Sequence, residues 1–203
     1  MFGAIIYVPL FVQRVLGESA SSSGVVLTPL MLGIITMSIL AGQIVSRTGH
    51  YRPVLMAGPP LMAAGFLLLA QIDVGTSELT VTRDVVIVGF GIGLMMQTLI
   101  VAVQNAVGRR RIGVATASIQ FFRTVGAMTG VSVMGAIVTA RLGGAVGGGV
   151  TPAELAGALH PIFYLAIGLA AVALAAVFFV PHIELRQTME DAATSPELLQ
   201  EAA

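Results

Sequence analysis

The sequence predicts an all-α membrane protein with six transmembrane helices. Of its 203 residues, 56% are hydrophobic and 10% are charged, and the mean hydropathy is +0.95. A water-soluble domain carries about a quarter of its residues as charged side chains, so most of this surface must face lipid. Residues 1–182 form the predicted transmembrane domain, with a polar tail over 183–203. The six apolar runs of that domain are 2–16, 24–45, 53–72, 84–107, 114–140 and 161–181.

The first run differs from the other five in length. A bilayer core takes about 20 helical residues, and the run over 2–16 is shorter than that. It also starts at the first residues of the chain. We therefore expect that the beginning of this helix is missing or that the chain is a fragment.

Composition and spacing argue against several other classes of protein. The formal net charge is zero, which gives no electrostatic basis for binding nucleic acid. Cysteine is absent, so neither disulfides nor thiolate metal sites can form. His50, His160 and His182 stand at predicted membrane edges without the spacing of metal ligands. No nucleophile has a base beside it, so we expect neither a metal site nor an enzyme.

Arginine counts set the predicted orientation. One side of the membrane would hold six arginines and the other three, and the richer side is cytoplasmic by the positive-inside rule. With six helices, both termini and the tail are then cytoplasmic. The richer side comprises Arg47, Arg52, Arg109, Arg110, Arg111 and Arg186, and the other comprises Arg14, Arg83 and Arg141.

Polar side chains are concentrated in four of the six runs. The third and sixth runs have almost none at mid-span, so we expect these two helices to face lipid and the other four to face protein or a watery cavity. Outer helices at positions three and six suggest a 3+3 repeat of the kind found in transporters. The residues that we expect to line a cavity or gate are Tyr7, Gln13, Gln97, Gln104, Asn105, Gln120 and Arg123.

Arg123 is the most informative of these residues. It would lie about 12 Å into the membrane at 1.5 Å per residue, where an arginine needs partners or water. Counting along the antiparallel fourth helix places Gln97 and Thr98 near its level. Arg123 is then a cation of a cavity or gate, or it extends to the headgroups, or it ties two helices together.

Carboxylates are missing from mid-span positions. Proton-coupled transporters commonly hold the proton on an intramembrane acid, and here Asp84, at the predicted outer end of the fourth helix, is the nearest approach to one. We therefore expect the proton-coupling site to lie outside this chain unless Asp84 serves.

Glycine and proline positions predict local features of the helices. Gly89 and Gly93, like Gly126 and Gly130, are spaced by four residues, which favours close helix packing in lipid. The string Gly89–Gly93 is no nucleotide loop, because it lies inside an apolar helix. Ser19 to Gly24 is interpreted as a loop that ends in a helix N-cap. Bends are expected at Pro9, Pro29, Pro59 and Pro60.

Several strings resemble the C-terminal half of a major facilitator superfamily transporter, and most closely the fourteen-helix drug:proton antiporter group. The likeness covers about residues 5–182, and its order and spacing carry it more than any one string. The strings are Tyr7–Gln13 with Gly17, Leu27–Leu30, Gln104–Val107, Gly113–Ala117, Phe121–Gly126 and Gly130.

The superfamily's cytoplasmic loop signature has a partial counterpart here. Gly42, Arg47, Gly49 and Arg52 match its glycine and basic positions, whereas Ser46 stands where the family has an aspartate. An acid-based gating bond at this loop is therefore in doubt. The alternative interpretation is a loop whose arginines only set topology.

The resemblance implies one half of a major facilitator fold, acting in proton-coupled multidrug efflux of small amphipathic molecules across the cell membrane. It implies a missing N-terminal half as partner, which would hold the membrane acids, and no cofactor beyond the proton gradient. Two alternatives remain open: a non-transporting membrane scaffold or sensor half-domain, and a transporter for another class of solute.

Overall fold

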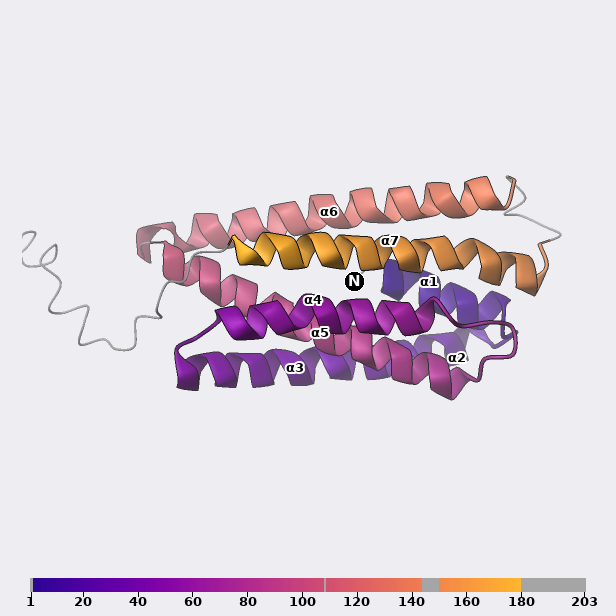
Figure 1. The fold of residues 1–203 in the computed structure, drawn as a ribbon, viewed down its shortest axis with the longest axis horizontal. Helices are drawn as coiled ribbons and strands as arrows, with labels where there is room; N and C mark the ends of the chain where they lie inside the picture. Colours follow the sequence, from indigo (N-terminus) through magenta and orange to yellow (C-terminus); the bar gives the residue numbers. More distant parts are fainter. Residues whose placement is uncertain (1, 108, 144–149, 180–203) are drawn as a thin grey trace, which may run out of the picture.

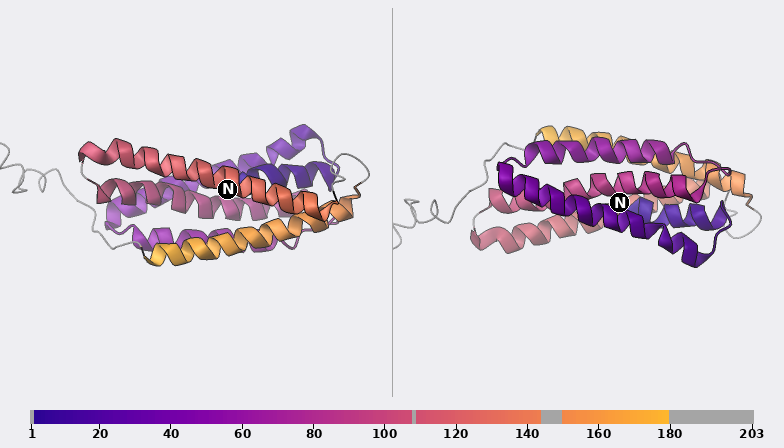
Figure 2. Two further views of the ribbon diagram at one scale, coloured as in Figure 1. Left: turned by 90° about the horizontal axis from the view of Figure 1, so that it is seen from above. Right: turned by 90° about the horizontal axis from the view of Figure 1, so that it is seen from below.

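The computed structural model describes residues 2–107, 109–143 and 150–179. Within these ranges the chain is helical and contains no strand. The long helices run side by side in a single bundle (Figures 1 and 2). The helices are α1 (Phe2–Arg14), α2 (Ala20–Val25), α3 (Leu27–Thr48), α4 (Arg52–Leu69), α5 (Glu78–Ala106), the 3-10 turn η1 (Arg109–Arg111), α6 (Ile112–Arg141) and α7 (Pro152–Phe178).

Five helical stretches are long and apolar enough to cross a membrane, with α2 and α3 forming one of them. The helix α1 is apolar but shorter, at 13 residues. The predicted all-α membrane fold is therefore confirmed, and α1 is the shortest of the six described apolar helical stretches, when α2 and α3 are counted as one. The predicted tail over 183–203 lies outside the described residues.

Three helices begin earlier than the apolar runs predicted, because each starts with a polar turn. The helix α5 begins at Glu78 rather than near residue 84. Its first turn is capped by the Ser77 side chain, which accepts a hydrogen bond from the Thr80 amide at 3.3 Å. At the start of α7, Thr151 and Glu154 form a reciprocal capping box. Ser19 caps α2 through the Ser22 amide at 3.1 Å, so the predicted loop over 19–24 is a helical turn whose cap stands at its beginning.

The proline at position 29 explains why α2 and α3 are separate helices. Proline has no N–H, so residue 29 cannot donate to the carbonyl four residues earlier, that of Val25. The helix is interrupted at Val26, next to that carbonyl. By contrast, Pro9 lies inside α1, and Pro59 and Pro60 lie inside α4, without ending either helix.

The helix α5 packs against α3 on one face and α4 on the other through glycine. A β-carbon built on Gly89 would lie 2.7 Å from the Leu30 carbonyl oxygen, and one on Gly93 would lie 2.5 Å from that of Ile34. Such separations leave no room for a side chain, so the two backbones are in direct contact. The predicted packing role of Gly89 and Gly93 is confirmed. On the opposite face, a β-carbon on Gly91 would lie 2.8 Å from the Gly58 carbonyl oxygen of α4.

Polar contacts join α7 to the start of α4 and to the turn that follows α4. Arg52 Nη2 donates to the Phe178 carbonyl at 3.1 Å, and a ring nitrogen of His160 lies 2.9 Å from the Ile72 carbonyl oxygen. These two contacts join opposite ends of the helix pair. They fix α7 antiparallel to α4.

The helix α6 has much less contact with the rest of the bundle than α4 or α5. Of its residues, only Met134 and Val138 are buried. A β-carbon on Gly126 or Gly130 would meet no atom within 4 Å. The prediction that these two glycines pack against another helix is therefore wrong for the described part of the chain, and they leave open space beside α6.

We predict that Gly93→Val destabilises the protein and that Gly126→Val does not. Valine at position 93 would collide with the α3 backbone, and overpacking of this kind costs about 1–3 kcal/mol. The two substitutions change helix propensity equally, so position 126 is a matched control. Thermal unfolding of the purified protein in detergent measures the difference. A similar midpoint for both variants would contradict the packing described here.

Candidate functional site

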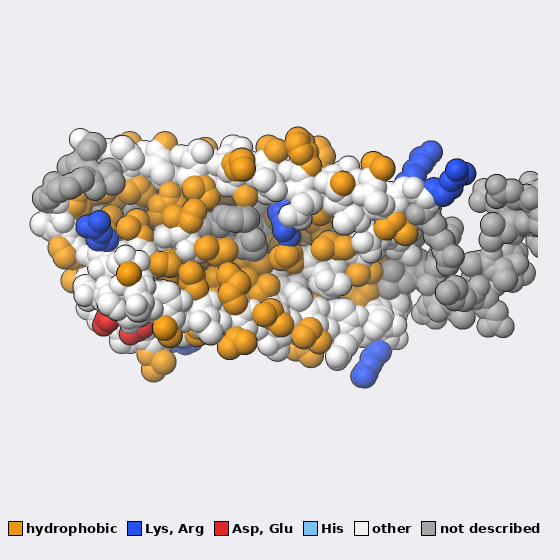
Figure 3. Space-filling view, turned by 180° about the vertical axis from the view of Figure 1, so that it is seen from behind, with side chains coloured by type: hydrophobic (Ala, Val, Ile, Leu, Met, Phe, Trp, Pro, Cys, Tyr) orange, Lys and Arg blue, Asp and Glu red, His pale blue; other side chains and the backbone are white. Residues whose placement is uncertain are grey.

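A mostly apolar cavity of about 340 Å³ lies between α5 and α6, with further lining residues from α1, α4 and α7. Figure 3 shows the hydrophobic side chains along one face of the molecule, with basic groups at its ends and near its middle. Four methionines contribute to the cavity lining: Met62, Met95, Met96 and Met134. Gly126 and Gly130 form part of its wall on α6. Neither has a side chain, and no atom of another described helix lies within 4 Å of where a β-carbon would be.

A second cavity of about 470 Å³ continues between α5 and α6. Val103 of α5 and Ser118 and Phe122 of α6 line it. Both cavities are lined by Met96, Leu99 and Arg123. The two cavities therefore share one wall, and that wall carries their only basic side chain among the described residues.

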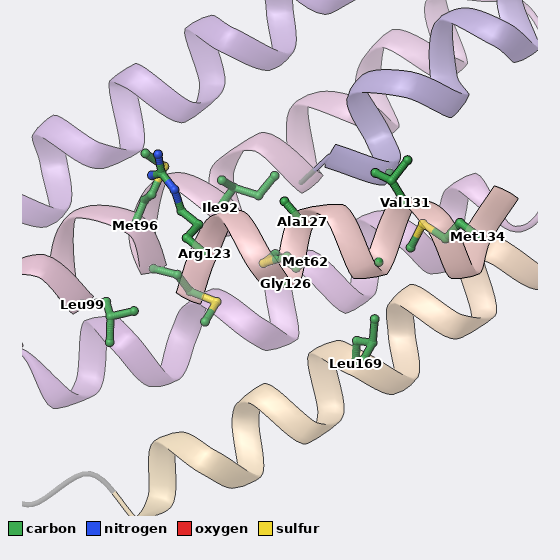
Figure 4. Close-up of a pocket in the computed structure, with 13 residues that line it drawn as sticks. Met62, Ile92, Met96, Leu99, Arg123, Gly126, Ala127, Val131, Met134 and Leu169 are labelled. Atoms are coloured by element: carbon green, nitrogen blue, oxygen red, sulfur yellow. The ribbon is translucent and has the colours of Figure 1, made fainter. Parts of the chain in front are cut away.

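Arg123 extends from α6 beside Met96 (Figure 4). It stands eleven residues after the start of α6 at Ile112, about 16 Å along the helix. Its side chain is half-buried. Within the described ranges it forms no hydrogen bond and no ion pair; the ion pair found there joins Arg83 and Asp84. The site thus contains a cation without a protein partner in the described structure.

The residues of α5 that share the cavity with Arg123 differ from those predicted. Gln97 and Thr98 were expected at its level, but Met96 and Leu99 line the cavity instead. Gln97 is half-buried and lies toward α3, where its Cγ would be 3.8 Å from a β-carbon on Gly42. Thr98 is 1% exposed, and its hydroxyl has no hydrogen-bond partner. The predicted level along α5 agrees with the structure, because Met96 and Leu99 flank Gln97 and Thr98 in the sequence, but the rotation of α5 about its axis was not predicted.

Three of the predicted polar residues join neighbouring helices. The Tyr7 hydroxyl donates to the Val131 carbonyl at 3.4 Å and so links α1 to the wall of the first cavity. Gln13 Nε2 donates to Ser23 Oγ at 2.7 Å, which links α1 to α2. Gln104 Nε2 donates to Thr116 Oγ1 at 3.2 Å, which links α5 to α6. Their observed contacts are between helices of this chain.

The two remaining amides lie outside both cavity linings. Gln120 is exposed on α6, and its backbone carbonyl accepts a hydrogen bond from the Thr124 hydroxyl at 2.9 Å. Asn105 is half-buried near the end of α5, where it has an interaction partner. A gating role for either amide stays a prediction.

The predicted loop motif joins α3, α4 and α7. Gly49 has a φ of 71° and ends α3, with its amide donating to the Val45 carbonyl at 2.9 Å. Arg52 begins α4 and holds the end of α7 through the Phe178 carbonyl. Arg47 is exposed in the last turn of α3, and Gly42 lies one turn and a half earlier, next to Gln97. No described contact links these residues to the cavities.

Asp84 was predicted to stand beside an external connection, but it lies inside α5 and is 1% exposed. Its Oδ1 pairs with Nη2 of Arg83 at 2.7 Å. The Ser77 cap moves the helix start to Glu78, which brings Asp84 into the bundle. Recognition of that cap in the sequence would have placed Asp84 inside the helix; its burial follows from the packing of α5.

The methionines of the cavity were also not singled out from the sequence. Methionine is the usual residue of adaptable apolar surfaces, and the chain contains ten. Their scattered positions give no local pattern, so their convergence requires the fold. No three histidine, cysteine or acidic side chains of the described residues lie together as metal ligands would.

Known proteins resemble this chain over most of its length. It is 44% identical over 141 residues to the multidrug transporter protein MdtP of Bacillus subtilis, covering 70% of this chain and 26% of that protein. It is 35% identical over 133 residues to the thioclapurine efflux transporter tcpA of Claviceps purpurea, covering 66% of this chain and 24% of that protein. The chain therefore spans about a quarter of the length of these relatives.

The fold has a solved counterpart in the inward-open xylose transporter XylE from E. coli. The two superpose with a TM-score of 0.72 over 99% of this chain and 50% of that chain, at 18% sequence identity. This likeness shows that the bundle is one half of such a fold. The sequence model of the Major Facilitator Superfamily matches residues 1–131. This chain belongs to the Major Facilitator Superfamily.

Proposed function

We propose that the chain is the C-terminal half of an efflux transporter for small amphipathic molecules, and that the space between α5 and α6 is part of its substrate passage. The observation that carries the proposal is the pair of apolar cavities that share Arg123. Their volumes are in the range of about 300–1,000 Å³ that small-molecule sites occupy. The names of the multidrug and efflux relatives support the same direction of transport.

The cavity lining supports an amphipathic substrate. Thioether side chains are flexible and polarisable, so a surface with Met62, Met95 and Met96 can adapt to apolar bodies of different shape. A purely apolar lining would leave the orientation of a ligand undefined. Arg123 supplies one polar point at which the ligand can be oriented.

The distribution of arginine supports a location in the cell membrane with both termini cytoplasmic. The short connection between α3 and α4 is flanked by Arg47 and Arg52, and the connection between α5 and α6 contains Arg110 and Arg111. Short basic loops of this kind remain in the cytoplasm. We propose this orientation for the chain.

Proton coupling is proposed from the family resemblance. Among the described residues, no carboxylate lines either cavity, and the buried Asp84 is paired with Arg83. We propose that the proton-binding acid belongs to an N-terminal half. That half would also cover α6, most of whose surface is exposed.

We predict that a cysteine at Ser118 reacts with a membrane-impermeant thiol reagent at least about tenfold faster than one at Val172, because thiolate formation needs water. Both side chains are exposed in the bundle, Val172 at 65%. A difference in labelling rate therefore shows whether each side chain faces water or lipid, because both are free of cover within the bundle. This chain contributes no native cysteine to the labelling, and the full-length protein without an introduced cysteine gives the background.

A cysteine at Leu67 serves as the second lipid-facing control, since α4 is also an expected outer helix and Leu67 is 47% exposed. Labelling is measured in intact membranes of cells expressing the full-length protein. Equal labelling at Ser118 and at the two control positions would contradict a watery passage beside α6.

We predict that this chain alone, in liposomes with an imposed pH gradient, moves neither a fluorescent lipophilic cation nor a fluorescent lipophilic anion faster than empty liposomes do. Alternating access rocks one half of such a transporter against the other, and a single half lacks that counterpart. Gradient-driven movement of either dye above the empty control, abolished by Arg123→Ala, would show a complete transporter and contradict the assignment as a half.

A further inference from the structure

We infer that Arg123 binds the negatively charged end of the substrate, so that the substrate class is amphipathic anions such as carboxylates on an apolar body. This inference rests on the proposed function and adds the charge of the ligand to it. It is carried by the position of one unpaired guanidinium on the wall that two apolar cavities share.

The first step is the charge of the cavities. Arginine stays protonated under all conditions that proteins meet, so the cavities carry a permanent positive charge. No described carboxylate neutralises it, since the ion pair found in the described ranges is that of Arg83 with Asp84. A cationic ligand in either cavity would be repelled, whereas an anionic one would supply the missing partner.

The second step is the chemistry of the group. The guanidinium is a planar fork of N–H donors that matches a carboxylate through two parallel hydrogen bonds. Around it lie Met96 and Leu99, which offer neither a charge nor a strong acceptor. The low polarity of these neighbours strengthens an ion pair formed there.

The third step is the space for the rest of the molecule. Gly126 and Gly130 follow Arg123 on α6 by about one and two turns, and both line the first cavity. Nothing lies within 4 Å of a β-carbon built on either glycine. An apolar body attached to a carboxylate at Arg123 can therefore extend along α6 toward Met134.

Two alternatives compete with a substrate anion. Arg123 could pair with a carboxylate of the proposed N-terminal half, or its own side chain could extend to the lipid headgroups. Either would leave the cavities without preference for the charge of a ligand. The experiment must therefore compare ligands that differ in charge and share one apolar body.

The test uses the full-length transporter, with both halves, in zwitterionic lipid nanodiscs, and 4-(1-pyrenyl)butanoate and its primary amide are the probes. Equilibrium dialysis at neutral pH measures the saturable binding that remains after subtraction of empty nanodiscs. We expect the butanoate to bind about tenfold more tightly than the amide, the size of one charge-assisted pair. Arg123→Gln should remove this preference, because the butanoate then loses its charged partner and binds about as weakly as the amide.

Two further variants separate charge recognition from structural effects. Arg123→Lys keeps the charge without the fork, so it should restore only part of the preference. Arg141→Gln changes an exposed arginine at the far end of the same helix and should behave as the wild type.

Each remaining outcome overturns a defined part of the account. Equal affinity for both probes, or a preference that survives Arg123→Gln, overturns anion recognition and leaves the proposed function standing. Loss of amide binding together with butanoate binding in Arg123→Gln shows that Arg123 holds the helices together, and also overturns it. Absence of saturable binding of either probe overturns the proposed function and the inference with it.

Discussion

The α5 backbone lies in direct contact with the backbones of α3 and α4, and this contact determines where the other helices can pack. Gly89 and Gly93 bring α5 against α3, and Gly91 brings it against α4. In lipid there is little hydrophobic force between helices, so close van der Waals packing at small residues must hold them. Once α3, α4 and α5 are fixed, the contacts of Arg52 and His160 place α7 along α4.

The same packing leaves α6 at the side of the bundle and creates the space in front of it. Glycines fix α5 against α3 and α4 on two of its faces. Met96 and Leu99 lie on the remaining face and line both cavities opposite α6. The helix α6 is linked to the bundle by Gln104 at Thr116, near its start, and by Tyr7 at Val131, about two thirds along it. Between these two links no residue of α6 is buried. Its middle carries Arg123, Gly126 and Gly130, so a charge and free volume occur together at the exposed wall.

The sequence predicted the helices, their order and the family, because hydropathy and short strings are local properties. It misplaced helix starts where polar caps such as Ser77 and Thr151 precede the apolar run. Counting residues along the helices singled out Arg123 and predicted that Gln97 and Thr98 of α5 lie opposite it. In the structure, Met96 and Leu99 line the cavity with Arg123 instead. One residue of helical rotation amounts to about 100°, and that rotation is set by tertiary packing. For the same reason, Gly93 and Gly126 look alike in sequence, although one touches a neighbouring backbone and the other does not.

In the complete transporter, we expect α6 to form the wall of a passage and not to face lipid. A cryo-electron microscopy structure of the complete transporter in a lipid nanodisc tests it most directly. We expect ordered acyl chains against the exposed side chains of Leu67 on α4 and Val172 on α7. We also expect water, ligand or protein within hydrogen-bond distance of the Arg123 guanidinium. Acyl chains packed along Gly126 and Gly130, with Arg123 extended to the headgroups, would contradict it.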